Sequence, residues 1–157
     1  MTEPNLERIP TRREFCACCA RSAALVAFGG AAACGGSPTS PSGSSTPLAS
    51  ASGSVSGRTI SVSLASGALA TVGGLAITQT SLGNFLLART GDGTVTALTA
   101  ICTHEGCTVS NMSGSQFVCP CHGSTFNTSG GVANGPANRA LQQFPTQVAN
   151  GVVTFTV

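Results

Sequence analysis

Alternating hydrophobic and polar residues predict β-strands along the chain from about residue 58 onward. Ile60, Val62 and Leu64 alternate with threonine and serine, which is the two-residue period of a strand with one buried face. Turns rich in glycine and asparagine separate the later apolar runs, and no run after residue 57 keeps a helical period. The further strands that we expect span residues 75–78, 85–89, 94–101, 116–119, 144–149 and 152–157. The pattern predicts an all-β domain.

The last two expected strands form a hairpin, and a segment rich in cysteine and histidine interrupts the strand pattern before it. Asn150 and Gly151 separate the last two apolar runs, and an Asn-Gly pair favours the tight turn of a β-hairpin. Residues of about 100–139 hold clustered cysteines and histidines, so we expect them to form a lobe inserted into the β domain. We place the whole folded domain at residues 58–157.

Residues 35–57 differ from that domain in composition. They are almost entirely glycine, serine, proline, threonine and alanine, and such a segment buries too little apolar surface to fold. We expect a disordered linker that works as a tether.

Residues 1–34 have the features of an export signal. Arg12 and Arg13 precede an apolar run over residues 23–33, which resembles a Tat signal, with an ordinary Sec signal as the alternative. The run is shorter than the ~20 residues of a comfortable membrane span, although an uncleaved anchor stays open. Cys34 follows three alanines and precedes Gly-Gly-Ser, as at the start of a mature lipoprotein, so lipidation of Cys34 is a further hypothesis.

Charge is scarce in the expected domain and limits its partners. The net charge of the whole chain is +2, and the chain contains no lysine. Without a basic patch to neutralise phosphates, we expect no nucleic-acid binding. A strong steering field is also excluded, so partners would be recognised by local shape and apolar contact. The charged residues of the domain are Arg58, Arg89, Asp92, Glu105 and Arg139.

Cysteine and histidine gather in two short segments of the expected lobe. The chain holds eight cysteines and two histidines, and both histidines lie among the last four cysteines. Each segment offers a thiolate and an imidazole at short spacing, with one cysteine left over. Two thiolates and two imidazoles can ligate a metal, and tetrahedral zinc is the structural alternative to a redox centre. The six residues are Cys102, His104, Cys107, Cys119, Cys121 and His122.

The two segments closely resemble the metal-binding loops of the Rieske family. Residues 102–107 read C-T-H-E-G-C and residues 119–124 read C-P-C-H-G-S, where the family has C-T-H-x-G-C and C-P-C-H-G-S. Residues 135–137, Gly-Pro-Ala, are similar to the proline loop of the family. The resemblance implies a Rieske-type antiparallel β-sandwich with an inserted cluster-binding lobe and one 2Fe–2S cluster per chain.

Carried over by position, the resemblance assigns the ligands of that cluster. Cys102 and Cys119 would hold one iron, and His104 and His122 would hold the other. Imidazole ligands leave the cluster less negative than four thiolates would, which raises its reduction potential to roughly −150 to +300 mV.

The resemblance also implies a disulfide and a tuning hydroxyl. Cys107 and Cys121 would form a disulfide between the loops, which suits an exported protein. Ser124 matches a family serine whose hydroxyl bonds a bridging sulfide and raises the potential.

Three departures from the family pattern bear on the potential and on the partner. Phe126 stands where high-potential members carry tyrosine, so one hydroxyl donor is lost. Glu105 replaces a leucine next to the docking surface, where a carboxylate lowers the potential. Asn138 replaces the second proline of the proline loop. We expect a potential below that of typical quinol-oxidising members.

The resemblance predicts an electron carrier without catalytic residues of its own. The first hypothesis is the iron–sulfur subunit of a quinol:cytochrome c reductase type of complex. Its place would be the periplasmic face of the cytoplasmic membrane, after Tat export, either anchored by lipid or an N-terminal segment or free. The alternative is an electron-transfer subunit or free carrier for a periplasmic oxidoreductase, for example a molybdenum enzyme. A ferredoxin of an aromatic-ring oxygenase is a third reading, which the export signal and the surplus cysteines argue against.

Overall fold

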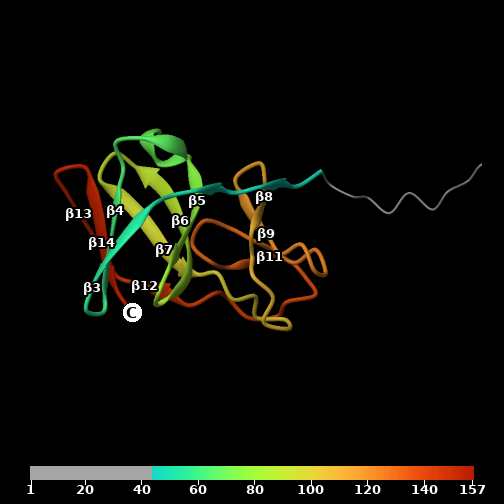
Figure 1. Cartoon of the computed structure of the whole chain (residues 1–157). Coiled ribbons are helices and arrows are strands. Elements are labelled where there is room, and N and C mark those ends of the chain that lie inside the picture. The colour runs from blue at the N-terminus through green and yellow to red at the C-terminus, as the bar shows by residue number, and fades with distance from the viewer. Residues whose placement is uncertain (1–43) are drawn as a thin grey trace, which may run out of the picture. The chain divides into compact units, whose positions relative to one another are not determined.

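Three β-sheets make up the part of the chain that the computed structural model describes, residues 44–157 (Figure 1). The lobe sheet has the order β1-β8-β9-β10-β11. The middle sheet has the order β12-β7-β6-β5-β2, and the terminal sheet has the order β13-β14-β4-β3. The only helical element in this range is a short 3-10 turn, η2. The expected all-β fold is confirmed.

The strands of the lobe sheet are β1 Thr46–Pro47, β8 Asn111–Ser113, β9 Gln116–Val118, β10 Thr125–Phe126 and β11 Val132–Asn134. Those of the middle sheet are β2 Ala49–Ser50, β5 Leu75–Thr80, β6 Gly83–Gly91, β7 Thr94–Thr99 and β12 Gln143–Phe144. Those of the terminal sheet are β3 Gly53–Ser56, β4 Thr59–Ser63, β13 Thr146–Ala149 and β14 Val152–Thr156, and η2 spans Gly67–Ala70.

The middle sheet is buried on both faces, which places it between two cores. Along β6, Leu86 and Ala88 belong to the core shared with the lobe, whereas Phe85 and Leu87 belong to the core shared with the terminal sheet. Successive side chains of a strand point to opposite faces, so a strand buried on both faces needs an unbroken apolar run. The run over residues 85–88 has this property, since all four residues are buried.

The lobe core is the one that positions the loops with cysteine and histidine. It joins the lobe sheet to one face of the middle sheet and includes both Cys102 and Cys119. Aromatic and aliphatic side chains of strands β9, β10 and β7 fill the space beneath them, among them Phe117, Phe126 and Leu98, none of which has exposed surface. The lobe is therefore packed against the middle sheet and shares a hydrophobic core with it.

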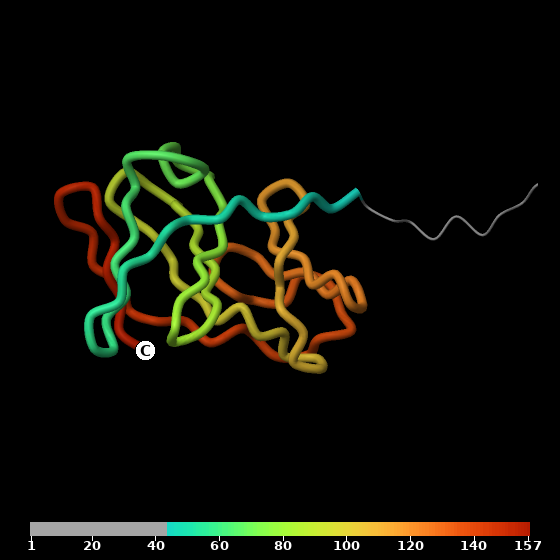
Figure 2. The backbone as a smooth tube through the Cα atoms, in the orientation of Figure 1, coloured from blue at the N-terminus to red at the C-terminus, as the bar shows by residue number. Residues whose placement is uncertain are grey.

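Residues 46–51 run across the molecule as a strap and correct the expected linker. β1 pairs with β8 of the lobe sheet, and β2 pairs with β5 of the middle sheet, the one parallel pairing among the described strands. Leu48 lies between them, is 7% exposed and belongs to the lobe core. Figure 2 shows this segment in cyan, passing from the lobe toward the terminal sheet.

The expected linker over residues 35–57 is thus wrong for its second half. β1, β2 and β3 all fall in it, although its composition is dominated by small residues. Main-chain hydrogen bonds to β8, β5 and β4 hold these strands, and such bonds need no large side chains. The domain therefore includes residues 46–56, ahead of the expected start at residue 58.

The last strands confirm the expected hairpin and divide the run that precedes it. Asn150 and Gly151 have positive φ values of 51° and 72°, as a tight hairpin turn requires, and β13 pairs with β14 on either side. The run expected over residues 144–149 splits at Pro145, because proline has no N–H for a ladder. β12 pairs with β7 in the middle sheet, and β13 joins the terminal sheet.

The expected export signal over residues 1–34, with Cys34, lies outside the described residues, as does the first part of the expected linker. Within residues 44–157, no helix is long and apolar enough to cross a membrane.

Candidate metal centre

The two cysteine- and histidine-bearing segments fold into loops of the same form. In the first loop, residues 102–107, the N–H of Gly106 donates to the Cys102 carbonyl over 2.9 Å. In the second loop, residues 119–124, the N–H of Gly123 donates to the Cys119 carbonyl over 3.0 Å. Both glycines have positive φ, 76° and 74°, with no atom near a would-be Cβ, so the backbone conformation alone favours glycine there.

A disulfide joins the two loops. Cys107 of the first loop and Cys121 of the second are bonded, with their Cα atoms 6.6 Å apart. This confirms the disulfide that the family resemblance implies. The bridge holds together two loops that lead into different strands of the lobe sheet, β8 and β10, and it encloses a short stretch of chain between them.

The remaining thiols, Cys102 and Cys119, are buried between the loops. Their exposed fractions are 3% and 1%, and neither is in a disulfide. Burial raises the pKa of the Cys119 thiol above its usual range, and the neighbouring Cys102 raises it further. Main-chain N–H groups of Cys121 and His122 bond the Cys119 sulfur and act in the opposite direction. The two thiols are thus shielded from water, and main-chain amides are directed at the sulfur of Cys119.

The two histidines lie on the outer side of the same loops and are exposed. The ring centroids of His104 and His122 are 5.0 Å apart, and the rings are nearly perpendicular at 88°. Nδ1 of His122 lies 3.7 Å from Oε2 of Glu105, with both side chains about half exposed. The four expected ligands are therefore arranged as buried sulfur and exposed nitrogen, with a carboxylate beside one imidazole.

The serine of the second loop is buried and connects to the expected proline loop. Ser124 has no exposed surface, and its Oγ accepts the N–H of Ala137 over 3.0 Å. Ala137 follows the cis peptide bond between Gly135 and Pro136. No hydrogen bond within residues 44–157 uses the hydroxyl proton of Ser124, so this buried proton lacks an acceptor from the described part of the chain.

Phe126 lies in β10, the strand that follows the second loop. It has no exposed surface and packs in the lobe core, so its position is apolar and offers no hydroxyl. Asn138, the other expected departure near the proline loop, is exposed.

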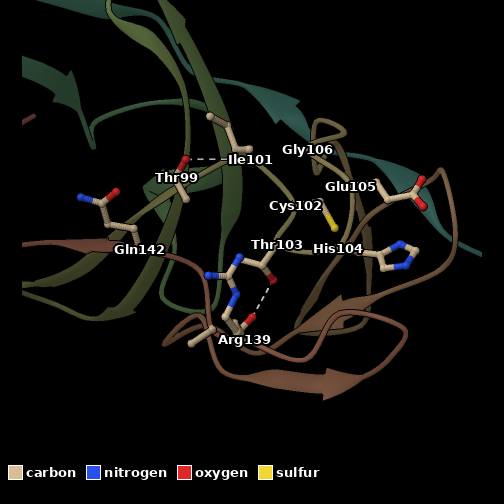
Figure 3. A pocket seen from close by; sticks show the side chains of 10 residues that line it. Thr99, Ile101, Cys102, Thr103, His104, Glu105, Gly106, Arg139 and Gln142 are labelled. Atoms are coloured by element: carbon tan, nitrogen blue, oxygen red, sulfur yellow. Dashed lines mark hydrogen bonds between the residues drawn. The ribbon is translucent and has the colours of Figure 1, made fainter.

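The first loop is also tied to the segment after the proline loop, a contact that sequence reasoning missed. Thr103 Oγ1 donates to the main-chain carbonyl of Arg139 over 2.6 Å. The two residues are far apart in the sequence, and no spacing pattern pairs them. Beside this bond lies a surface pocket of about 530 Å³ (Figure 3). It is lined by Thr99, Ile101, Cys102, Thr103, His104, Glu105, Gly106, Arg139, Ala140 and Gln142.

The residues of the two loops fit a binuclear iron–sulfur cluster. Two buried thiols and two imidazoles match the donor types that such a cluster takes from a protein. The unused hydroxyl proton of Ser124 matches a sulfide acceptor, which a single tetrahedral zinc ion would not supply. The fit rests on the chemistry of the donors and on this unpaired proton.

Comparison with known proteins agrees with the fit. The model of the Rieske [2Fe-2S] domain matches residues 65–145. The cytochrome b6-f complex iron-sulfur subunit of Cyanothece sp. (strain PCC 7425 / ATCC 29141) is 45% identical over 60 residues, which are 38% of this chain and 34% of that protein. Subunit 2 of the same name from Nostoc sp. is 41% identical over 92 residues, 57% of this chain and 49% of that protein.

The chain spans about a third of the length of the first relative and half of the second. Among solved structures, the cyanobacterial plasma membrane Rieske protein PetC3 from Synechocystis PCC 6803 is 34% identical. The match covers 53% of this chain and 86% of that one, with a TM-score of 0.48.

Proposed function

Because this chain belongs to the Rieske [2Fe–2S] domain family, which binds a 2Fe–2S cluster, we propose that it carries single electrons as the iron–sulfur subunit of a quinol-oxidising cytochrome complex. The names of its relatives support the kind of complex, since several are iron–sulfur subunits of cytochrome b6-f complexes. When bound, the cluster takes up and releases one electron at a time. The residues around the cluster hold it in place and tune its reduction potential.

In this proposal Cys102 and Cys119 hold one iron and His104 and His122 hold the other. The observation that carries it is the arrangement of the two loops, with sulfur donors buried and imidazoles exposed. Burial of the thiols keeps water from the sulfur side, and both thiols must lose their protons to hold iron. Exposure of the imidazoles leaves their outer edges open to a quinol or to a partner protein.

The residues behind the loops keep the site in place and set its electrostatics. The Cys107–Cys121 disulfide prevents the loops from separating, so the four donors stay arranged without bound metal. The Ser124 hydroxyl, whose oxygen accepts the Ala137 N–H, would donate its proton to the bound cluster and stabilise negative charge on it. Such a donor raises the reduction potential, because reduction adds the charge that it stabilises.

Chemical analysis of the full chain tests this function. We expect two irons and two sulfides per chain, visible colour and an EPR signal on reduction. Cys102→Ser and Cys119→Ser should abolish all of these, whereas Asn138→Ala, at an exposed position, should keep them. A colourless chain containing zinc would overturn the proposal.

A second candidate is an electron-transfer subunit or free carrier for another periplasmic oxidoreductase. The apolar surroundings of Phe126 and the exposed Glu105 beside His122 both favour a low potential. A redox titration separates the two candidates. A midpoint potential well below that of the quinone pool would exclude quinol oxidation and leave the second candidate.

The proposal places the domain on the periplasmic side, exported through the Tat pathway. It rests on the sequence of residues 1–34. Replacement of Arg12 and Arg13 by lysine should block export, while membrane retention that survives in Cys34→Ser would contradict a lipid anchor at that residue.

A further inference from the structure

The pocket beside His104 carries a positive charge that the fold itself does not use. Arg58 donates to the Val157 carbonyl, and Arg89 donates to carbonyls of η2 and of the β6–β7 turn. Arg139, by contrast, has no hydrogen bond or ion pair from its guanidinium within residues 44–157, and its side chain is exposed. Of the arginines in the described range, Arg139 alone is free to bind an external anion.

The main chain on both sides of Arg139 is fixed. Ala137 is bonded through its N–H to Ser124, and the Arg139 carbonyl accepts the hydroxyl of Thr103. Leu141 is buried, and its N–H donates to the Gly130 carbonyl over 2.9 Å. The guanidinium is therefore attached to a segment that is itself bonded to both metal-site loops, so its position relative to His104 is constrained at the backbone.

An exposed apolar side chain borders the same pocket. Ile101 is 60% exposed, more than any other large hydrophobic side chain of the described residues, and it directly precedes the buried Cys102. Figure 3 shows Ile101, Thr103, His104 and Arg139 among the side chains that line the pocket. An unpaired arginine beside exposed apolar surface suits a protein interface, whose centre is apolar and in which arginine is enriched.

Glu105 lines the same pocket but forms no salt bridge with Arg139. The close partner of Glu105 is His122, at 3.7 Å, and no ion pair links Glu105 to the guanidinium. Most residues that line the pocket are exposed, so it is open at the surface and admits side chains of another protein. A free small anion would gain only one charged donor there.

We propose that this pocket docks an acidic electron-transfer protein, with a partner carboxylate on Arg139 and an apolar partner side chain on Ile101. The proposal rests on the function proposed above and adds which partner the site accepts. Docking here brings the partner against the exposed edge of His104, next to the ligand set. A single local cation orients the partner at contact and leaves long-range steering weak, in keeping with the low charge of the domain.

Binding between oxidised proteins tests this without any electron transfer. The full chain, loaded and oxidised, is titrated by calorimetry with an oxidised c-type cytochrome of acidic isoelectric point, and separately with one of basic isoelectric point. Arg139→Gln should weaken binding of the acidic cytochrome by about fivefold at low ionic strength, with the loss shrinking as salt is added. Binding of the basic cytochrome should not weaken.

Arg58→Gln is the matched control, because it changes the net charge equally at the terminal sheet, on the other side of the middle sheet. It should leave binding of the acidic cytochrome unchanged. Ile101→Ser should weaken that binding at all salt concentrations. Equal effects of the two arginine variants, or none from Arg139→Gln, would overturn the proposal.

The outcomes also separate this inference from the function on which it rests. A chain that holds its cluster and exchanges electrons, yet binds both cytochromes alike, contradicts the docking site alone. A chain that holds no iron contradicts the proposed function.

Discussion

Ala137 donates its main-chain N–H to Ser124 Oγ over 3.0 Å, and this bond attaches the proline loop to the second metal-site loop. This bond uses a lone pair of the Ser124 oxygen and leaves the hydroxyl proton free to donate. The residue is fully buried, so neither water nor a neighbouring side chain of residues 44–157 competes for that proton.

We therefore expect Ser124→Ala to lower the midpoint potential while the cluster is kept. If the bond is stronger by about 1.4 kcal/mol in the reduced state, the shift is about 60 mV. Protein-film voltammetry measures it. Ser115→Ala, at an exposed position, is the control and should leave the potential unchanged. An unchanged potential in Ser124→Ala would show that its proton does not face the cluster.

Removal of the disulfide should destabilise both the fold and the site. In the chain-entropy model, a bridge that closes such a short loop contributes about 3 kcal/mol, and Cys107 and Cys121 are 14 residues apart. The double variant Cys107→Ser/Cys121→Ser should unfold at lower urea concentration and lose its visible absorbance faster in air. Equal lifetimes of colour in both proteins would contradict a clamping role.

Replacement of Glu105 should affect the potential and leave the fold intact. Glu105 is 61% exposed and His122 is 46% exposed, so solvent screens their interaction. We expect Glu105→Gln to raise the midpoint potential by at most about 40 mV, which corresponds to about 1 kcal/mol. The shift should diminish at high salt, and thermal stability should stay the same. A lower potential would reverse the sign that we assign to this carboxylate.

The Cys119 thiol should titrate above the usual range of cysteine in the metal-free chain. Burial and the nearby Cys102 raise its pKa, so it stays protonated at pH values where an unfolded chain has begun to ionise. The rate of alkylation by iodoacetamide should therefore rise at a higher pH than the midpoint of about 8.5 for free cysteine. Cys102→Ser should move this midpoint only part of the way down, because burial is the larger cause.

The raised pKa of the Cys119 thiol also determines how the stability of the metal-free fold changes with pH. A thiol with a raised pKa in the folded state contributes no penalty below its ordinary pKa, and the metal-free fold loses stability as the pH rises from there toward the raised value. Cys119→Ser should remove that loss.

The strap should be part of the folded domain. Leu48→Ala removes a buried side chain from the lobe core, and we expect a loss of about 3 kcal/mol in the free energy of unfolding. Thr46→Ala, at an exposed position one strand earlier, should cost little. Removal of residues 1–43 should leave the urea midpoint unchanged, whereas removal of residues 1–51 should lower it. Equal urea midpoints of the two truncated chains would contradict this and would support the linker over residues 35–57 that the sequence predicts.

Sequence reasoning succeeded where side chains carry the signal. The strand at Ile60 and Val62 has one buried face, and its alternation shows this directly. The loops were assigned by family resemblance, which included the Cys107–Cys121 bridge. β1, β2 and β3 were missed because main-chain pairing holds them, with Leu48 as almost the only large apolar anchor. The role of Arg139 was missed because its neighbours are set by tertiary contacts alone.

Leu86 and Leu87 are adjacent in β6 and belong to different cores, one on the lobe side and one on the side of the terminal sheet. A substitution that disturbs the packing of either core therefore affects the same strand, β6. The two halves are expected to melt as a single calorimetric unit, with equal van't Hoff and calorimetric enthalpies. Loss of colour on heating should then coincide with loss of the β-sheet signal far from the iron.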